Sequence, residues 1–181
     1  MYKYDPYTGR HKKVTKNRLR NVLITIVIAF LLSILTRKFI LFPYTIKNDF
    51  MEPTYAKGKT VYITPLYNKN NLVYGDIVFV RSAYNQSKIF IARVIGRPTD
   101  RVYIKNRRVY INDRSLELSN KLLFNDKRPS FPVSFSRRDN MEEIFVKEDS
   151  YFLLADNRDI AFDSREMGLV HKTLIIGKIV F

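Results

Sequence analysis

The 181-residue sequence contains no cysteine and only two histidines. Without cysteine, neither a disulfide nor a thiolate metal site can form, which is compatible with a location outside the cytoplasm but does not require it. A zinc site would have to be built largely from carboxylates, and no spacing of metal ligands appears. We therefore expect no metal and no other cofactor, and we expect His171 to be an ordinary surface residue.

The positive charge of the chain is unevenly distributed. The net charge is +15, and residues 1–38 contribute +8 of it with nine Lys or Arg and one Asp. The remaining +7 is spread over the rest of the sequence, without a basic helical stripe, a zinc-finger spacing or a Gly-rich phosphate loop. These features argue against a nucleic-acid partner and favour contact with anionic lipid.

The N-terminal forty residues have the layout of a membrane anchor. A basic tail over residues 1–20 precedes an apolar run from Val22 to Leu35 that only Thr25 and Ser33 interrupt. No small-residue cleavage site follows, so we predict an uncleaved transmembrane segment over residues 21–38, with a buried soluble helix as the alternative. Seven Lys or Arg lie before the run and two just after it, which predicts a cytoplasmic N-terminus and an extracytoplasmic domain over residues 39–181.

Beyond residue 38 the sequence is typical of a mainly β domain, with short β-branched and aromatic runs bounded by Gly, Pro, Asn and Asp. The two-residue connection Asn106-Arg107 predicts a β-hairpin, although Arg adopts positive φ less readily than Asn. Residues 112–147 are polar and contain Pro129 and Pro132, which indicates a long surface excursion with a short helix or none. The predicted strands are residues 39–46, 60–64, 76–81, 89–95, 102–105, 108–111, 151–154 and 174–181.

Three ordered motifs carry a family resemblance. They are Phe50-Met51-Glu52-Pro53-Thr54, Ala92-Arg93-Val94-Ile95-Gly96 and Ala155-Asp156-Asn157-Arg158-Asp159-Ile160-Ala161-Phe162-Asp163-Ser164-Arg165. They resemble the Ser-Met-x-Pro-Thr, Lys-Arg-Val-Ile-Gly and Gly-Asp-Asn-Arg-x-x-Ser-x-Asp-Ser-Arg motifs of type I signal peptidases, which are membrane-anchored serine proteases with a Ser/Lys dyad. The resemblance begins near Phe39 and continues to the end of the chain. It implies antiparallel sheets in a partly open β-barrel, with a cleft near the membrane surface.

The chemistry of that family is missing from the matching positions. The resemblance places the nucleophilic Ser at Phe50, the general-base Lys at Ala92 and the Ser that hydrogen-bonds this Lys at Ala161. Amide hydrolysis by such a dyad needs a hydroxyl and a neutral amine, and an apolar pocket must lower the pKa of that amine. We expect the residues flanking Ala92 to form the pocket, namely Ile89, Phe90, Ile91, Val94 and Ile95. Asn48 replaces a Gly usual in Gram-positive members, which alters the backbone that forms the oxyanion hole.

The residues that do match the motifs are expected to be structural. Met51 and Pro53 would shape the turn by packing and by a fixed φ. Two opposite-charge pairs among Asp156, Arg158, Asp163 and Arg165 would brace the loop behind the cleft, with ordinary turn solvation as the alternative. Ser164 would make a structural hydrogen bond. The full structural set is Met51, Pro53, Thr54, Arg93, Gly96, Asp156, Asn157, Arg158, Asp163, Ser164 and Arg165.

The sequence therefore predicts a membrane-anchored signal peptidase homologue that does not cleave. It is similar to the catalytically inactive paralogue that some Gram-positive bacteria carry beside an active enzyme, with Phe50 either filling the cleft as a plug or only bordering it. Two binding functions stay open: signal peptides held by strand addition, or association with an active signal peptidase. A hydrolase of altered mechanism is the third alternative.

Overall fold

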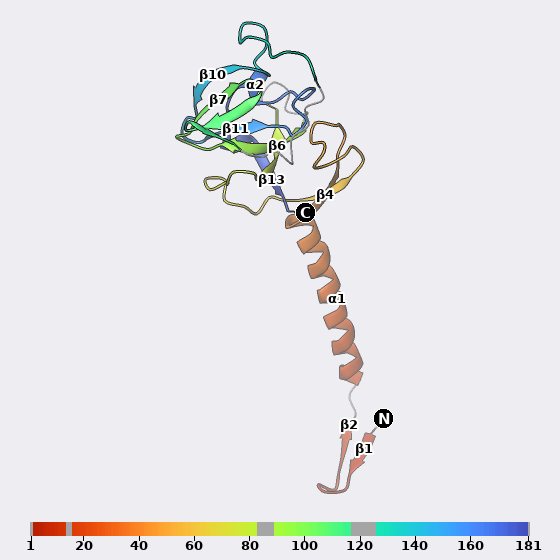
Figure 1. Ribbon diagram of the computed structural model, residues 1–181. Coiled ribbons are helices and arrows are strands. Elements are labelled where there is room, and N and C mark those ends of the chain that lie inside the picture. The colour runs from red at the N-terminus through yellow and green to blue at the C-terminus, as the bar shows by residue number, and fades with distance from the viewer. Residues whose placement is uncertain (1, 14–15, 83–88, 117–125, 181) are drawn as a thin grey trace. The chain divides into compact units, whose positions relative to one another are not determined.

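The computed structural model describes residues 2–13, 16–82, 89–116 and 126–180 of a chain that divides into two units, Met1–Ile40 and Leu41–Phe181. The first unit contains a hairpin and a long helix (Figure 1). Strands β1 (Tyr2–Asp5) and β2 (Arg10–Lys13) pair antiparallel, and α1 runs from Lys16 to Phe39. The helix thus begins four residues before the predicted tail ends.

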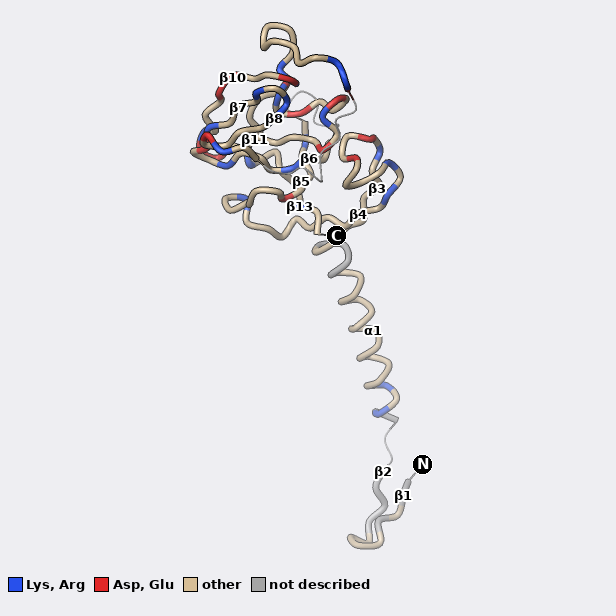
Figure 2. The backbone as a smooth tube through the Cα atoms, in the orientation of Figure 1, with Lys and Arg blue, Asp and Glu red and all other residues tan. Residues whose placement is uncertain are grey.

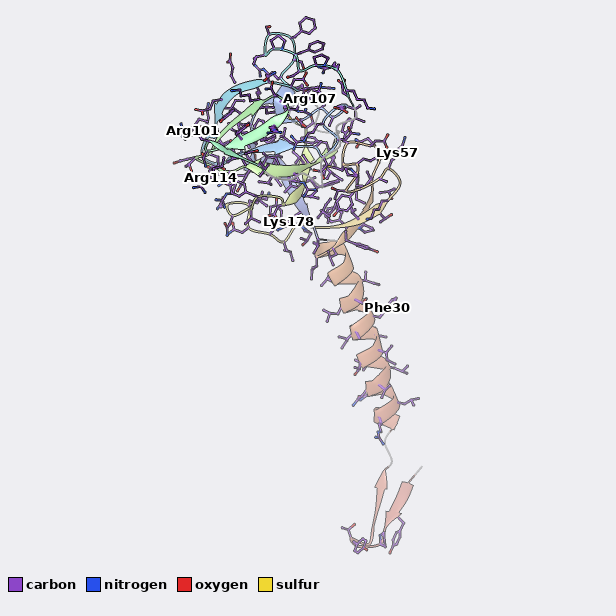
Figure 3. The ribbon with its side chains drawn as sticks, in the orientation of Figure 1. Phe30, Lys57, Arg101, Arg107, Arg114 and Lys178 are labelled. Carbon is purple, nitrogen blue, oxygen red and sulfur yellow. The ribbon has the colours of Figure 1, made fainter. Side chains whose placement is uncertain are left out.

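Helix α1 is apolar on all sides. The segment from Arg18 to Leu35 has a mean hydropathy of 2.0, and every one of its residues is exposed. Its middle carries no charge (Figure 2), and side chains such as Phe30 project outward (Figure 3). At 24 residues, α1 has a length of about 36 Å, enough for a bilayer core of roughly 30 Å. The extension of the helix beyond the apolar run removes the shortfall in length that Val22–Leu35 alone would have.

The second unit is mainly β and is built on a curled, seven-stranded antiparallel sheet, which confirms the predicted fold class (Figure 1). A smaller antiparallel sheet of four strands packs against two strands of the large sheet, β6 (Ile89–Gly96) and β11 (Ser150–Leu154), through a shared cluster of buried side chains. In the large sheet the order is β12 (Val170–His171), β11 (Ser150–Leu154), β6 (Ile89–Gly96), β5 (Ile77–Arg81), β13 (Ile175–Ile179), β4 (Thr60–Thr64) and β3 (Phe42–Thr45). In the small sheet it is β10 (Met141–Phe145), β7 (Arg101–Lys105), β8 (Arg108–Ile111) and β9 (Arg114–Ser115).

Alternation along the strands divides the core of the second unit into three clusters. On β5, Ile77 and Phe79 join the first cluster, while Val78 and Val80 join the second. The third cluster fills the small sheet with side chains such as Val102 and Val109, and it includes Phe152 and Leu154 of β11. The same strands therefore contribute to different cores on their two faces.

Most predicted strands agree with the observed strands to within a residue, and two needed correction. The strand predicted over residues 39–46 begins at Phe42, because α1 continues through Phe39. The strand predicted over residues 174–181 begins at Ile175, because a 3₁₀ turn (η2) occupies Lys172–Leu174, and it ends at Ile179. Residue 181 lies outside the described residues.

The predicted hairpin between β7 and β8 is present, and its turn is left-handed at both central residues. Asn106 has φ of 49° and Arg107 has φ of 67°. Asn tolerates this conformation, whereas Arg does not favour it. Contacts of the Arg107 side chain offset the cost: its Nε donates to Asp139 at 3.0 Å and its Nη2 donates to the carbonyl of Arg128 at 2.9 Å.

The predicted surface excursion contains strands rather than a helix in its described parts, with β9 at Arg114–Ser115 and β10 at Met141–Phe145. Residues 117–125 lie outside the described residues. The segment from Asp126 to Asn140 is tied to the small sheet by Asp139, which accepts hydrogen bonds from Arg107, Arg128 and the backbone of Phe131. Burial raises the pKa of Asp139, but these bonds lower it more, so the net pKa lies below the ordinary value.

Candidate active-site remnant and its buried charge cluster

The turn that carries Phe50 lies between β3 and β4. Ile46 and Met51 are buried in the first cluster, and the phenyl ring of Phe50 packs against that cluster while staying partly exposed. A tight turn follows, in which the N–H of Tyr55 donates to the carbonyl of Met51 at 2.8 Å. The peptide bond between Glu52 and Pro53 is cis. Position 50 is therefore fixed at the border of a core.

The backbone of Phe50 is held on both sides. Its N–H donates to Oδ1 of Asn48 at 3.3 Å, and its carbonyl accepts from the N–H of Asn157 at 2.9 Å. The side-chain amide of Asn157 also donates to the carbonyl of Asp49 at 3.2 Å. Asn48 was singled out only as a missing glycine, and its bond to the Phe50 N–H was not foreseen. The N–H of Phe50 thus has a partner within its own turn.

On β6, Ala92, the predicted base position, and Arg93, a predicted structural residue, face opposite sides of the sheet. Ala92 is fully buried in the second cluster with Val78, Val80 and Val94, whereas Arg93 points to the opposite face. The predicted apolar pocket is therefore only partly right. Phe90 and Val94 share the face of Ala92, but Ile89 and Ile91 pack in the first cluster and Ile95 in the third. The error has a simple cause, because neighbours along a strand alternate between faces.

The structure brings two of the three degenerate positions into one cluster. Ala161 is fully buried in the first cluster, against which Phe50 packs. Ala92 lies in the second cluster. At all three positions the side chain is in contact with apolar neighbours.

Arg93 binds a carboxylate far away in sequence. Its Nε donates to Oδ1 of Asp156 at 2.8 Å and its Nη2 to Oδ2 at 2.5 Å, a bidentate pair in which both side chains are buried. The hydroxyl of Thr54 donates to the same carboxylate at 2.5 Å, and Nη1 of Arg93 donates to the carbonyl of Gly75 at 2.9 Å. This group connects the turn after β3 with β6 and with the loop after β11.

Asp163 forms a second buried pair at the start of the short helix α2 (Ser164–Met167). Its carboxylate accepts from Nε of Arg165 at 2.9 Å and from the N–H of Ala155 at 3.0 Å, and it caps the helix. Ser164 accepts from the N–H of Leu153 at 3.0 Å. Nη1 of Arg165 donates to the carbonyl of Arg158 at 2.9 Å, which closes the loop on itself.

Arg158 is buried, and among the described residues two of its nitrogens, Nε and Nη2, have no hydrogen-bond partner. Its side chain belongs neither to the pair of Arg93 with Asp156 nor to that of Arg165 with Asp163. Burial lowers the pKa of Arg158 to about 10, while Asp163 opposes that shift and Arg165 adds to it. The buried cluster of Arg93, Asp156, Arg158, Asp163 and Arg165 thus contains three cations and two anions.

Comparison with known proteins identifies the family. The family model described as "Signal peptidase, peptidase S26" matches residues 19–181, which is most of the chain. This chain belongs to the signal peptidase family. It is 32% identical over 174 residues to signal peptidase IB of Staphylococcus aureus, covering 92% of this chain and 90% of that protein. It is 31% identical over 160 residues to signal peptidase I of Bacillus amyloliquefaciens, covering 86% and 84%.

A solved structure is also similar. The crystal structure of a signal peptidase I from Enterococcus faecalis is 26% identical, with a TM-score of 0.48, and the match covers 61% of this chain and 97% of that one.

Gly96, which ends the second signal peptidase motif, allows close packing between the two sheets. A Cβ there would lie 2.7 Å from Cγ2 of Val102 and 3.0 Å from Cβ of Phe152. The first distance is shorter than real Cβ contacts and the second is tight, so a larger residue would force Val102 on β7 to shift and would crowd Phe152 on β11. The glycine has a packing role within this fold.

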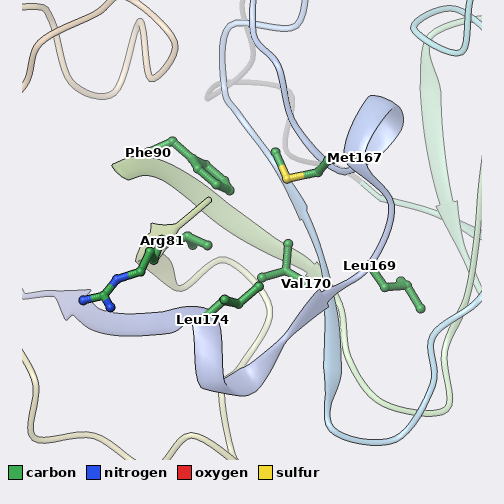
Figure 4. A pocket seen from close by; sticks show the side chains of 7 residues that line it. Arg81, Phe90, Met167, Leu169, Val170 and Leu174 are labelled. Atoms are coloured by element: carbon green, nitrogen blue, oxygen red, sulfur yellow. The ribbon is translucent and has the colours of Figure 1, made fainter. Parts of the chain in front are cut away.

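A small pocket lies near the second cluster. It holds about 60 Å³ and is lined by Val80, Arg81, Phe90, Met167, Leu169, Val170 and Leu174. The side chains of Phe90, Met167, Val170 and Leu174 lie around it, while those of Arg81 and Leu169 point away (Figure 4). None of the three degenerate positions lines it.

Two substitutions in the charge cluster are expected to have opposite effects. Asp156→Asn leaves Arg93 buried without its counter-ion and should lower the free energy of unfolding by roughly 3–5 kcal/mol. Arg158→Met removes a buried cation that has unpartnered nitrogens, and should leave stability unchanged or raise it. Both are measured by denaturant unfolding of the full chain in detergent, followed by circular dichroism. Equal destabilisation by the two variants would contradict this account of Arg158.

Proposed function

We propose that this chain is a membrane-anchored member of the signal peptidase family that does not cleave peptide bonds. The observation that carries the proposal is that a phenyl ring and two methyl groups, at Phe50, Ala92 and Ala161, occupy the positions of the family's nucleophile, base and supporting hydroxyl, and pack in apolar clusters. A phenyl ring cannot attack a carbonyl, and a methyl group cannot accept a proton. The relatives named above carry ordinary signal peptidase names, so the proposal rests on these positions.

The oxyanion hole supports the same conclusion. In acyl transfer, backbone N–H groups near the nucleophile stabilise the charge that develops on the carbonyl oxygen. Here the N–H of Phe50 already donates to Asn48. Loss of a nucleophile or base from a serine protease typically costs about a millionfold in rate, and the remaining losses do not add independently. Residual cleavage by this route would be undetectable.

Cleavage of a preprotein by the purified full chain is the direct test, and no product is expected above a mock purification. The triple variant Phe50→Ser/Ala92→Lys/Ala161→Ser should gain cleavage, and each single restoration should stay inactive. Adding Asn48→Gly to the triple variant should raise the rate further, because it removes the side-chain oxygen that accepts a hydrogen bond from the N–H of residue 50. The proposal would be refuted by two results together: cleavage activity that co-purifies with the unmodified chain, and labelling of that chain by a serine-reactive probe.

We further propose that the N-terminus is cytoplasmic and the second unit extracytoplasmic. The supporting observation is the excess of Lys and Arg before the apolar part of α1. Because the chain lacks cysteine, Thr8→Cys and Ser115→Cys variants each carry a single thiol. In intact cells, a membrane-impermeant thiol reagent should label only the Ser115→Cys variant. Labelling of Thr8→Cys alone would reverse the orientation.

A second candidate function is retention of extended peptides without cleavage, including signal peptides. It is favoured by the position of β3 at the sheet edge beside partly exposed apolar side chains of the first cluster, such as Phe42, Tyr44 and Phe50. An edge strand with side-chain pockets is the usual arrangement for strand addition. Association with an active signal peptidase is a related proposal, which co-purification would test.

If the ring of Phe50 blocks this cleft, Phe50→Ala should bind a fluorescent signal peptide at least threefold more tightly than the unmodified chain, by anisotropy titration. Phe145→Ala, which removes an equally apolar but distant exposed ring, is the matched control and should leave binding unchanged. Absence of saturable binding in every variant would refute peptide retention.

A further inference from the structure

A pocket opens at the edge of the small sheet. It holds about 420 Å³, within the range of roughly 300–1,000 Å³ that is usual for binding pockets. Strand β9 forms the edge, and β8 is the one strand that pairs with it in the part of the chain that the structure describes. The pocket is lined by the turn before β5 and by the β8–β9 hairpin, through Tyr74, Ile111, Asn112, Arg114, Ser115 and Leu116.

The register of this hairpin places a guanidinium beside an apolar floor. Arg114 lies directly opposite Ile111, and opposite residues of an antiparallel pair point to the same face of the sheet. Ile111 is buried in the third cluster, and Leu116 packs against that cluster. Arg114, labelled in Figure 3, is exposed and forms no ion pair with any residue that the structure describes.

The ring of Tyr74 forms a wall of the pocket, and its position is fixed. Its hydroxyl donates to the carboxylate of Asp100, whose oxygens lie at 3.0 and 2.9 Å. The guanidinium of Arg97 lies 4.3 Å from the centre of the ring. The same carboxylate accepts from Nδ2 of Asn112 at 2.8 Å and from the N–H of Arg97 at 2.7 Å. Asp100 thus ties the turn before β5 to the hairpin, and the pocket between them is preformed.

The charges around the pocket favour an anionic ligand. Asp100 is buried and engaged by the donors just described, and Asp113 in the hairpin turn pairs with Arg101 at 3.1 Å. No carboxylate among the described residues lines the pocket. The guanidinium of Arg114 is therefore not neutralised from within the hairpin, and a carboxylate is the group whose geometry it matches best.

The edge of β9 presents main-chain groups beside the pocket. The N–H of Leu116 donates to the carbonyl of Val109 at 2.8 Å, which makes these opposite residues a hydrogen-bonded pair. Bonded and non-bonded pairs alternate along an antiparallel ladder, so the N–H and C=O of Ser115, opposite Tyr110, point away from β8. A donor and an acceptor that point outward from a sheet edge are the template for adding a strand.

We propose that the β9 edge and its pocket bind an extended peptide that carries a carboxylate. The peptide backbone pairs with Ser115, an apolar side chain lies between the ring of Tyr74 and Leu116, and the carboxylate pairs with Arg114. A peptide is favoured because the outward main-chain groups and the pocket lie side by side, whereas a small carboxylate ligand would use the pocket alone. This site is distinct from the β3 edge, which belongs to the large sheet. The proposal does not depend on catalytic inactivity.

The test is an anisotropy titration of the full chain in detergent with pools of fluorescein-labelled hexapeptides. In each pool Thr alternates with an equal mixture of Val, Leu and Phe before a final Glu or Gln, and the C-terminus is free or amidated. The pool with Glu and a free C-terminus should bind saturably. If the carboxylate at Arg114 is the terminal one, binding survives the change to Gln; if it is the side chain, binding survives amidation. Equal binding by the amidated Gln pool would overturn the proposal.

Variants of the chain separate the two contributions. Arg114→Gln should weaken binding at least fivefold and abolish the preference over the amidated Gln pool. Ser115→Pro removes the outward N–H without touching the ladder to β8, and should also weaken binding at least fivefold. Arg108→Gln is the matched control, because it removes an exposed arginine from the opposite face of β8, and it should leave binding unchanged. An unchanged unfolding midpoint for each variant verifies that the fold is retained.

The position of the bound peptide is found by replacing Phe in the pool with benzoylphenylalanine and mapping the photo-crosslinks by mass spectrometry. Crosslinks are expected at residues 72–76 and 111–116. Crosslinks confined to residues 42–50 would place the peptide at the β3 edge and overturn the present proposal while supporting peptide retention there. Full affinity in Ser115→Pro with loss in Arg114→Gln would indicate a carboxylate site without strand addition. Equal loss in Arg108→Gln, or no saturable binding of any pool, would also overturn the proposal.

Discussion

The bidentate pair between Arg93 and Asp156 is the interaction on which the arrangement of the candidate site depends. It joins β6 to the loop after β11, and through Thr54 and the carbonyl of Gly75 it fixes the turn after β3 and the turn before β5. These segments are distant in sequence, and the buried charge pair adds to backbone bonds between them, such as those from the N–H of Gly75 to Val94 and from the N–H of Asn157 to Phe50. Burying the pair requires that every donor and acceptor be satisfied. That requirement explains why Thr54 belongs to the same motif as the nucleophile position.

The motif residues that this chain shares with the family are those whose side chains hold segments of the fold together or allow them to pack closely. Asp156 pairs with Arg93, Asp163 binds Arg165 and the N–H of Ala155, and Gly96 permits the two sheets to approach. At Phe50, Ala92 and Ala161 the side chains pack only against apolar neighbours, and these residues are compatible with the fold. A match to the family motifs is therefore stronger evidence for the fold than for the catalytic reaction.

Much of the fold could be predicted from the sequence, because strand periodicity and turn residues are local signals. Strands β4 and β8 were predicted at their observed bounds, and the hairpin turn at Asn106-Arg107 was found despite the unusual Arg. Strand β10 was missed because Glu142 and Glu143 interrupt its apolar pattern at a bulge. The partner of Asp156 was also missed, since pairing across 63 residues has no local signal. An arginine inside the apolar strand β6 could have indicated that a buried carboxylate lies opposite.

The alternation of β6 has a consequence for substitutions at neighbouring positions. Ala92 and Arg93 are adjacent in sequence but belong to opposite faces, so a side chain at position 92 can change without disturbing the brace at position 93. A lysine placed at position 92 would enter a fully buried apolar environment, where desolvation costs stability. The same desolvation would lower the pKa of the amine and so favour its neutral form.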